Sequence, residues 1–224
     1  MSAKLEALVA DEEPARWLEP ALHDDLAAAG VTRLQVNVSD EQVAGALRLR
    51  HLPEVLTVVL GVWTETGRVD DVVAALGRHG AVWVYEVEER RPLDPPEAWD
   101  GSRADALANV AVLRRPAELD REEWLRRWLG PHTTVAIETQ ATFGYLQNVV
   151  VRPLNADAPA VDAVVEELFP LAAVGDVHAF YGSGGDDAEL ARRITRLMES
   201  VTSIGADRDL DLVPTGRYLF DLDR

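Results

Sequence analysis

The strongest constraint on the fold is that the sequence predicts the same series of strands and helices twice. Arg16-Trp17-Leu18-Glu19-Pro20 in the first half matches Arg127-Trp128-Leu129-Gly130-Pro131 in the second. A Leu-Gln pair follows each match at almost the same distance, Leu34-Gln35 and Leu146-Gln147. Repetition of residues together with a shared order of elements indicates duplicated units. Two such units in one chain can pack their sheets together as a pseudo-dimer. Each sheet then covers the face of the other that would be exposed to solvent in an isolated unit.

Each half reads as a βαββαβ series. In the first half, hydrophobic patterning predicts strands over 34–38, 55–63 and 81–88 and helices over 12–29, 41–50 and 70–77, whereas the run 4–10 fits a strand or a helix turn. A Pro-rich linker over 91–102 leads to the second series. There we expect strands over 109–115, 143–152, 176–181 and within 210–219, and helices over 120–137, 162–169 and 186–200. The sequence therefore predicts an α+β protein with an N-terminal unit, residues 1-100, and a C-terminal unit, residues 101-224.

The helix that follows Asp120 carries the best candidate for chemistry. Asp120 suits an N-cap, and acidic residues follow it in the first turn. Trp124, Trp128 and His132 fall at i, i+4 and i+8, so one face carries two indoles and an imidazole. Pro131 cannot donate to the helical ladder and disfavours helical angles at the residue before it. We therefore expect His132 at a break or kink, where an imidazole can face a cavity.

Two further stretches supply side chains that could meet this imidazole. Phe143, Tyr145 and Gln147 alternate along a predicted strand and so share one face. His178 and Phe180 share a face of the predicted strand 176–181, although a period of two does not show which face is buried. We predict catalytic roles for His132 and Tyr145. The predicted substrate-binding residues are Gln147, His178, Phe180, Trp124, Trp128 and Phe143.

Each of these roles has a plainer alternative. His132 could simply bond a backbone carbonyl at a helix end, and Trp124 and Trp128 could be core residues. Glu138 and Gln140 are expected at solvated positions, and so are Glu166 and Glu167 on the predicted helix 162–169. The stretch Gly182 to Gly185 is expected to be a strand-to-helix turn rather than a phosphate loop, because no phosphate-loop pattern is completed and two aspartates follow it.

The second half also resembles a known family. The order LRRP, REEW, W with PHT, GYLQNVVVRPL, VEELFP and HAFYG is similar to that of the EthD-domain family. The resemblance implies a dimeric α+β barrel of ferredoxin-like units, here closed within one chain, whose lumen holds a small molecule. It also implies that His132 faces that lumen. The family usually carries this histidine in a continuous helix end, whereas Gly130 and Pro131 precede it here.

Composition excludes several classes of function. The charge is 22 − 39 = −17 without basic runs, so neither nucleic acid nor an anionic membrane is expected as a partner. Cysteine is absent, and the sequence shows neither a signal peptide nor a membrane span, so a cytoplasmic protein is expected. Without Cys ligands or an HExxH motif, no metal site is expected.

These observations lead to a functional hypothesis. We expect a cofactor-free enzyme acting on a hydrophobic oxygenated metabolite in the barrel lumen, with a homodimer possible. His132 would be the general acid/base, and Tyr145 or Gln147 would orient a hydroxyl or carbonyl group. Elimination, decarboxylation, isomerisation and cyclisation are compatible with these groups. The rival classes are a non-catalytic small-molecule-binding or accessory protein, and a barrel that binds haem through a histidine.

Overall fold

The computed structural model describes residues 2–80 and 82–223. The first series consists of β1 (Ser2–Val9), α1 (Pro20–Ala29), β2 (Val31–Val38), β3 (Val58–Glu65), α2 (Val69–Arg78) and β4 (Val82–Leu93). Short 3₁₀ turns over Pro14–Leu18, Glu41–Val43 and Thr66–Arg68 connect these elements. The run 4–10, whose sequence fits either a strand or a helix turn, lies mostly in β1, and Ala81, the predicted start of the fourth strand, lies outside the described residues.

The second series repeats this order. It consists of β6 (Leu107–Leu113), α3 (Arg121–Arg127), α4 (Thr133–Thr139), β7 (Gly144–Pro153), β8 (Ala163–Phe169), α6 (Asp187–Ser203) and β9 (Leu210–Asp221). A π-helical turn, Trp128–His132, joins α3 to α4, and a 3₁₀ turn, Leu171–Val174, precedes the short α5 (Val177–Tyr181). Between the two series, β5 (Asp100–Arg103) pairs with β9.

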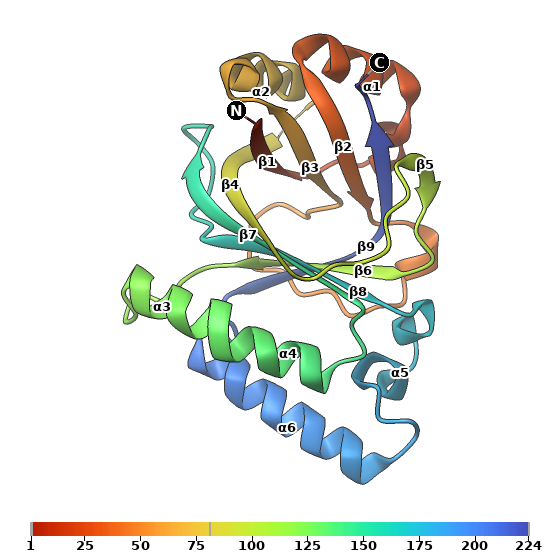
Figure 1. Ribbon diagram of the computed structural model, residues 1–224, viewed down its shortest axis with the longest axis vertical. Helices are drawn as coiled ribbons and strands as arrows, with labels where there is room; N and C mark the ends of the chain where they lie inside the picture. Colours follow the sequence, from red (N-terminus) through yellow and green to blue (C-terminus); the bar gives the residue numbers. More distant parts are fainter. Residues whose placement is uncertain (1, 81, 224) are drawn as a thin grey trace.

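The two four-stranded sheets close into one barrel. The strand order is β2-β3-β1-β4-β7-β8-β6-β9, and pairing of β2 with β9 completes the circle. All these pairings are antiparallel. Helices α1 and α2 cover one side of the barrel, and α3, α4 and α6 cover the opposite side (Figure 1). The predicted α+β architecture of tandem βαββαβ units forming a pseudo-dimeric barrel is confirmed.

Several predicted elements are wrong. The predicted helix 162–169 is β8, because Val164, Val165 and their neighbours pair with β6 on one side and β7 on the other, and this long-range pairing overrides the helical character of Glu-Glu-Leu. The predicted strand 176–181 is α5. Its helical start is stabilised by Asp176, whose side chain accepts from the backbone N–H of His178, and it ends at Gly182 in the left-handed conformation.

Three boundaries also differ from the sequence-based expectation. The predicted helix 12–29 breaks at Glu19, because Pro20 opens a new helix. Only Glu41–Val43 of the predicted helix 41–50 is helical, as a 3₁₀ turn. The predicted linker 91–102 is partly strand, since β4 continues to Leu93 and β5 begins at Asp100. The division at residue 100 stays a prediction.

The register shows that the repeat is offset by one residue from the Leu-Gln match. Gln35 points into the barrel, where its amide contacts Asn37 and Glu166. Gln147 points outward to the helices, where its amide donates to Thr133. A slip of one residue exchanges the two faces of a strand. The alignment of the Leu-Gln pairs is therefore wrong, although the duplication itself holds.

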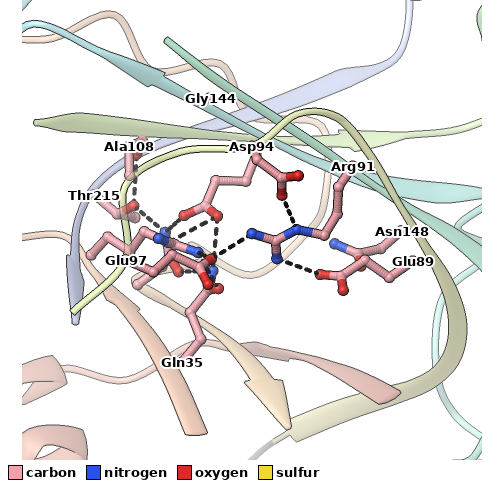
Figure 2. A network of polar contacts seen from close by, with 12 residues as sticks. Gln35, Glu89, Arg91, Asp94, Glu97, Ala108, Gly144, Asn148 and Thr215 are labelled. Carbon is pink, nitrogen blue, oxygen red and sulfur yellow. Dashed lines mark hydrogen bonds and ion pairs between the residues drawn. The ribbon is translucent and has the colours of Figure 1, made fainter. Parts of the chain in front are cut away.

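Side chains fill the barrel lumen. One end is an apolar cluster that includes Leu8, Val59, Val110 and Val213 from both halves. The other end is polar (Figure 2). There Arg217, which is 1% exposed, contacts Glu97 at 2.8 Å and Glu166 at 3.2 Å.

Lys4 lies in the same polar end. Its ammonium group is 2.6 Å from Glu89, 2.8 Å from Asn148 and 3.2 Å from Glu6. Burial raises the pKa of Glu6 to about 7 despite the opposing effect of Lys4. Protein side chains therefore occupy both the apolar and the polar end of the lumen, so the expectation of a ligand there is not met.

No helix in the described parts of the chain is long and apolar enough to cross a membrane.

Candidate functional site

An apolar cavity lies outside the barrel, between the second sheet and the helices that cover it. Its volume is about 370 Å³, which lies within the range of small-molecule sites. Helix α6 contributes Leu197 and Val201, and the sheet contributes Ala111 and Val165. The remaining helical wall is a row of residues at intervals of four, Trp128, His132, Ala136 and Gln140.

The first half also contributes to this cavity. Leu47, Leu49 and His51, from the segment between β2 and β3, line it. The backbone N–H and C=O groups of Leu49 bond those of Leu212 on β9, at 3.1 Å in each direction. This bridge holds a loop of the first unit against the site of the second.

Three polar side chains form one row across the cavity floor. Tyr145 on β7 pairs in register with Glu167 on β8, which pairs with Asn109 on β6. Directly paired residues on one face have Cβ atoms about 5 Å apart. We call Tyr145, Glu167 and Asn109 the polar row. All three line the cavity, so their polar groups can reach the same bound molecule.

Glu167 is the acidic member of the row. It forms no ion pair with any residue in the described ranges, and burial raises its pKa to about 7. Gln140 is the nearest polar group on the helical wall: with its amide turned to donate, its nitrogen lies 3.2 Å from Oε1 of Glu167. A carboxyl group with this pKa can both accept and return a proton near neutral pH.

His132 lines the helical wall of the cavity at a local break in the helix. Pro131 interrupts the α-helical ladder, and the chain forms a wider π turn. Thr133 Oγ1 donates to the carbonyl of Trp128 at 2.8 Å, which compensates the disturbed backbone. Nδ1 of His132 lies 3.0 Å from Ser200 Oγ on α6. Burial lowers the pKa of His132 to about 4, so the imidazole is neutral at pH 7.

Tyr145 completes the polar surroundings. Burial, and then the charge of Glu167, raise the pKa of its hydroxyl well above the ordinary value, so the group is a neutral phenol. Trp128 and Gln147 lie close enough to oppose this shift. The buried Trp128 Nε1 and Gln147 Oε1 nevertheless have no hydrogen-bond partner within the described structure. Polar atoms without partners are uncommon in protein interiors and require an explanation.

Half of the eight predicted site residues line the cavity, and half do not. His132, Tyr145, Trp128 and Phe180 line the cavity. Gln147 lies behind it and binds Thr133 at 2.8 Å. The remaining three, Trp124, Phe143 and His178, lie elsewhere.

These three have other contacts. Trp124 stacks on Trp128 and donates to the carbonyl of Ile204, so it is a core residue. Phe143 packs against the small cluster that contains Leu168. His178 lies on α5 rather than on a strand, with Nδ1 2.7 Å from Ser183 Oγ.

Glu167, Gln140 and Asn109 are among the cavity residues that sequence reasoning missed. Glu167 was expected on a solvated helix, and Gln140 at a solvated position, but both line the cavity. Glu166, expected beside Glu167 in water, is 3% exposed and points into the barrel. The available signal was the third strand of the repeat, because a strand over 163–169 places Glu166 and Glu167 on opposite faces.

Nothing in the described residues gathers three or more potential metal ligands.

Comparison with known proteins supports the fold. No protein-family model and no curated protein matches the sequence. Among solved structures, an anthrone oxidase-like protein superposes with a TM-score of 0.57 at 10% identity, over 97% of this chain and 90% of that one. A "putative monooxygenase" from Lactobacillus acidophilus gives a TM-score of 0.51 at 11% identity, over 99% and 96% of the two chains. The chain has the fold of the dimeric α+β barrel proteins.

Proposed function

We propose that this protein is an enzyme that removes a proton from a hydrophobic, oxygenated small molecule bound between the second sheet and helices α4 and α6. The observation that carries the proposal is Glu167, a carboxyl group without an ionic partner among the described residues, on the floor of an apolar cavity. A base is most effective when its pKa lies near the working pH. Glu167, rather than His132, therefore takes the role of general base.

The other polar groups suit the oxygen atom of such a substrate. Removal of a C–H proton beside a carbonyl group places negative charge on the oxygen, and hydrogen-bond donors stabilise that charge. The Tyr145 hydroxyl is a neutral donor next to Glu167, and the Trp128 indole N–H is a neutral donor next to Tyr145. The neutral imidazole of His132 supplies a further hydrogen bond from the helical wall.

Proton removal leaves several reactions open. Elimination, isomerisation and cyclisation can begin with removal of a proton. The resulting carbanion can also be oxidised in a later step by molecular oxygen. The solved structures described as anthrone oxidase-like and as a monooxygenase suggest the last class. Membership of the EthD-domain family, which the sequence resemblance suggests, also stays a proposal. An anthrone is a suitable probe because its methylene protons are acidified through the ring system by the carbonyl group.

The proposal is tested by hydrogen exchange of anthrone in D₂O without oxygen, measured by mass spectrometry. The absence of oxygen isolates proton removal from any later oxidation. The wild type should accelerate exchange, and Glu167→Gln should lower that acceleration by on the order of a hundredfold or more. Glu122→Gln, which removes an exposed carboxylate from α3, is the matched control. Exchange that survives in folded Glu167→Gln would refute the role of Glu167, and tight binding without exchange would favour the binding-protein alternative.

A further inference from the structure

The cavity continues into a second apolar space. A groove of about 480 Å³ lies between the segment around Gly45 and the α5 region, and its walls include Leu107, Ala173 and Val177. Cavity and groove share five wall residues, Leu47, Asn109, Phe180, Tyr181 and Leu212. The two spaces are therefore neighbours that meet at these side chains.

Asn109 is the polar residue at this junction. It is 4% exposed, and its Oδ1 atom is buried without a hydrogen-bond partner in the described structure. A buried amide oxygen without a partner is unfavourable unless a bound molecule or water satisfies it. Asn109 also neighbours Glu167 in register, so a group that binds the amide lies beside the carboxyl group.

Exposed apolar side chains lie along both spaces. Leu47 is 67% exposed and Val177 is 48% exposed at the groove, and Met198 is 44% exposed at the cavity. Exposed apolar side chains that gather around a concave site mark binding surfaces. The apolar walls of the cavity and the groove thus meet at Asn109.

We infer that the groove is the second half of the ligand site, and that the ligand is an elongated apolar molecule whose hydroxyl or carbonyl group binds Asn109 where cavity and groove meet. This deepens the proposed function, on which it rests for the position of Glu167. An amide can donate and accept, so a hydroxyl group beside a carbonyl group satisfies both of its atoms. The apolar remainder of the ligand then extends past Phe180 toward Val177.

Salicylate esters provide a matched set of probes. Methyl and hexyl salicylate share a phenol beside a carbonyl group and differ in the length of the apolar tail, whereas hexyl benzoate lacks the phenol. Binding is measured by calorimetry and by salicylate fluorescence. The wild type should bind hexyl salicylate at least about tenfold more tightly than methyl salicylate, because additional methylene groups are buried in the groove.

Gly45→Leu tests the groove. A Cβ atom at Gly45 would lie 3.5 Å from Val174, an ordinary contact, and Gly45 lines the groove, so the added leucine side chain is expected to occupy part of it. The variant should lose most of the advantage of hexyl over methyl salicylate and retain the affinity for methyl salicylate. Gly67→Leu is the control, because a Cβ atom there meets nothing within 4 Å and Gly67 lies outside the groove. An unchanged advantage in Gly45→Leu would overturn the inference.

Asn109→Leu tests the anchor. Leucine is the residue at the equivalent position of the first sheet, Leu5, so the variant is expected to fold. It should remove the preference for hexyl salicylate over hexyl benzoate, an expected loss of about tenfold, and leave the affinity for hexyl benzoate unchanged. A retained preference would overturn the role of Asn109, and so would failure of the wild type to bind hexyl salicylate.

The binding tests and the exchange test fail independently. Ester binding requires no proton transfer, so loss of the exchange activity leaves the extended site intact. Exchange that depends on Glu167, combined with indifference to tail length, would leave the base and remove the groove.

Discussion

The two halves of the molecule place opposite chemistry at corresponding positions of their two sheets. In the second sheet, the polar row crosses β7, β8 and β6 in register. In the first sheet, the corresponding row across β2, β3 and β1 is Leu34, Val62 and Leu5. We call this the aliphatic row, and all three of its members are 0% exposed beneath the helices of the first half.

This difference separates what the fold requires from what the site requires. Strand pairing is the same in both halves, so the pairing alone does not create the cavity. The aliphatic row packs against its helices in one continuous core cluster, whereas the polar row faces open space. Buried polar atoms without hydrogen-bond partners cost stability, and among the described strand residues such side-chain atoms occur only in the second sheet, on Asn109, Gln147 and Arg217. Exchange of residues between the rows is therefore the most direct way to test the comparison.

The largest expected effect comes from placing the carboxyl group in the wrong half. Val62→Glu should lower the free energy of unfolding by about 4 kcal/mol or more, since a filled core offers neither space nor a partner for the charge. The reverse change, Glu167→Val, should leave the protein at least as stable as the wild type at pH 8. Urea unfolding followed by circular dichroism measures both. Similar costs for the two changes would show that the rows are not opposites.

A smaller effect concerns the dependence of stability on pH. The pKa of Glu167 is raised to about 7 from 4.5, so the folded protein binds this proton more tightly than the unfolded chain. The resulting stability is complete below about pH 4.5 and is lost as the pH rises through 7. Glu167→Gln should therefore change little at pH 5 and raise the free energy of unfolding by on the order of 2 kcal/mol at pH 8.

Glu6 supplies the comparison for this measurement. Its pKa is also raised to about 7, but Lys4 lies 3.2 Å away. Glu6→Gln removes an ion-pair partner together with the carboxylate, so it should gain less at pH 8 than Glu167→Gln. Equal gains would mean that the isolation of Glu167 has no energetic consequence.

The smallest of these effects distinguishes the two buried histidines on the first helices of the units. His132→Ala should slow anthrone exchange about tenfold, since it removes one neutral hydrogen bond from the cavity. His23, 2.8 Å from the carbonyl of Trp17, packs on Phe220 in the filled half. His23→Ala should lower stability and leave the exchange rate of the folded protein unchanged. A stronger effect of His23→Ala on the rate would show that the site extends to the helices of the first half.

Local patterning predicted the duplicated architecture because most strands and helices carry their own signals. The face of Trp128 and His132 was visible from spacing alone, and the alternation of Tyr145 with its neighbours identified β7. These two stretches supply residues on both sides of the cavity. Capping by Asp120, whose side chain accepts from the N–H of Glu123, was likewise visible in the sequence.

The rest of the site depends on pairing between distant segments. Glu167 becomes a cavity residue only because β8 pairs with β6 and β7, and paired glutamates within a short apolar run fit a helix equally well. Asn109 stands between apolar neighbours, and its importance follows from its register with Glu167. The position of the cavity outside the barrel follows from which face each strand buries, which a period of two does not determine.

The polar end of the barrel also gives this protein an internal reporter of its own opening. Lys4 is the one lysine in the sequence, and its ammonium group is held inside the barrel by Glu89, Asn148 and Glu6. An amine-selective reagent can therefore acylate a lysine side chain only in molecules whose strands have separated around β1. The extent of acylation, measured from the masses of the peptides, reports those openings without any introduced residue.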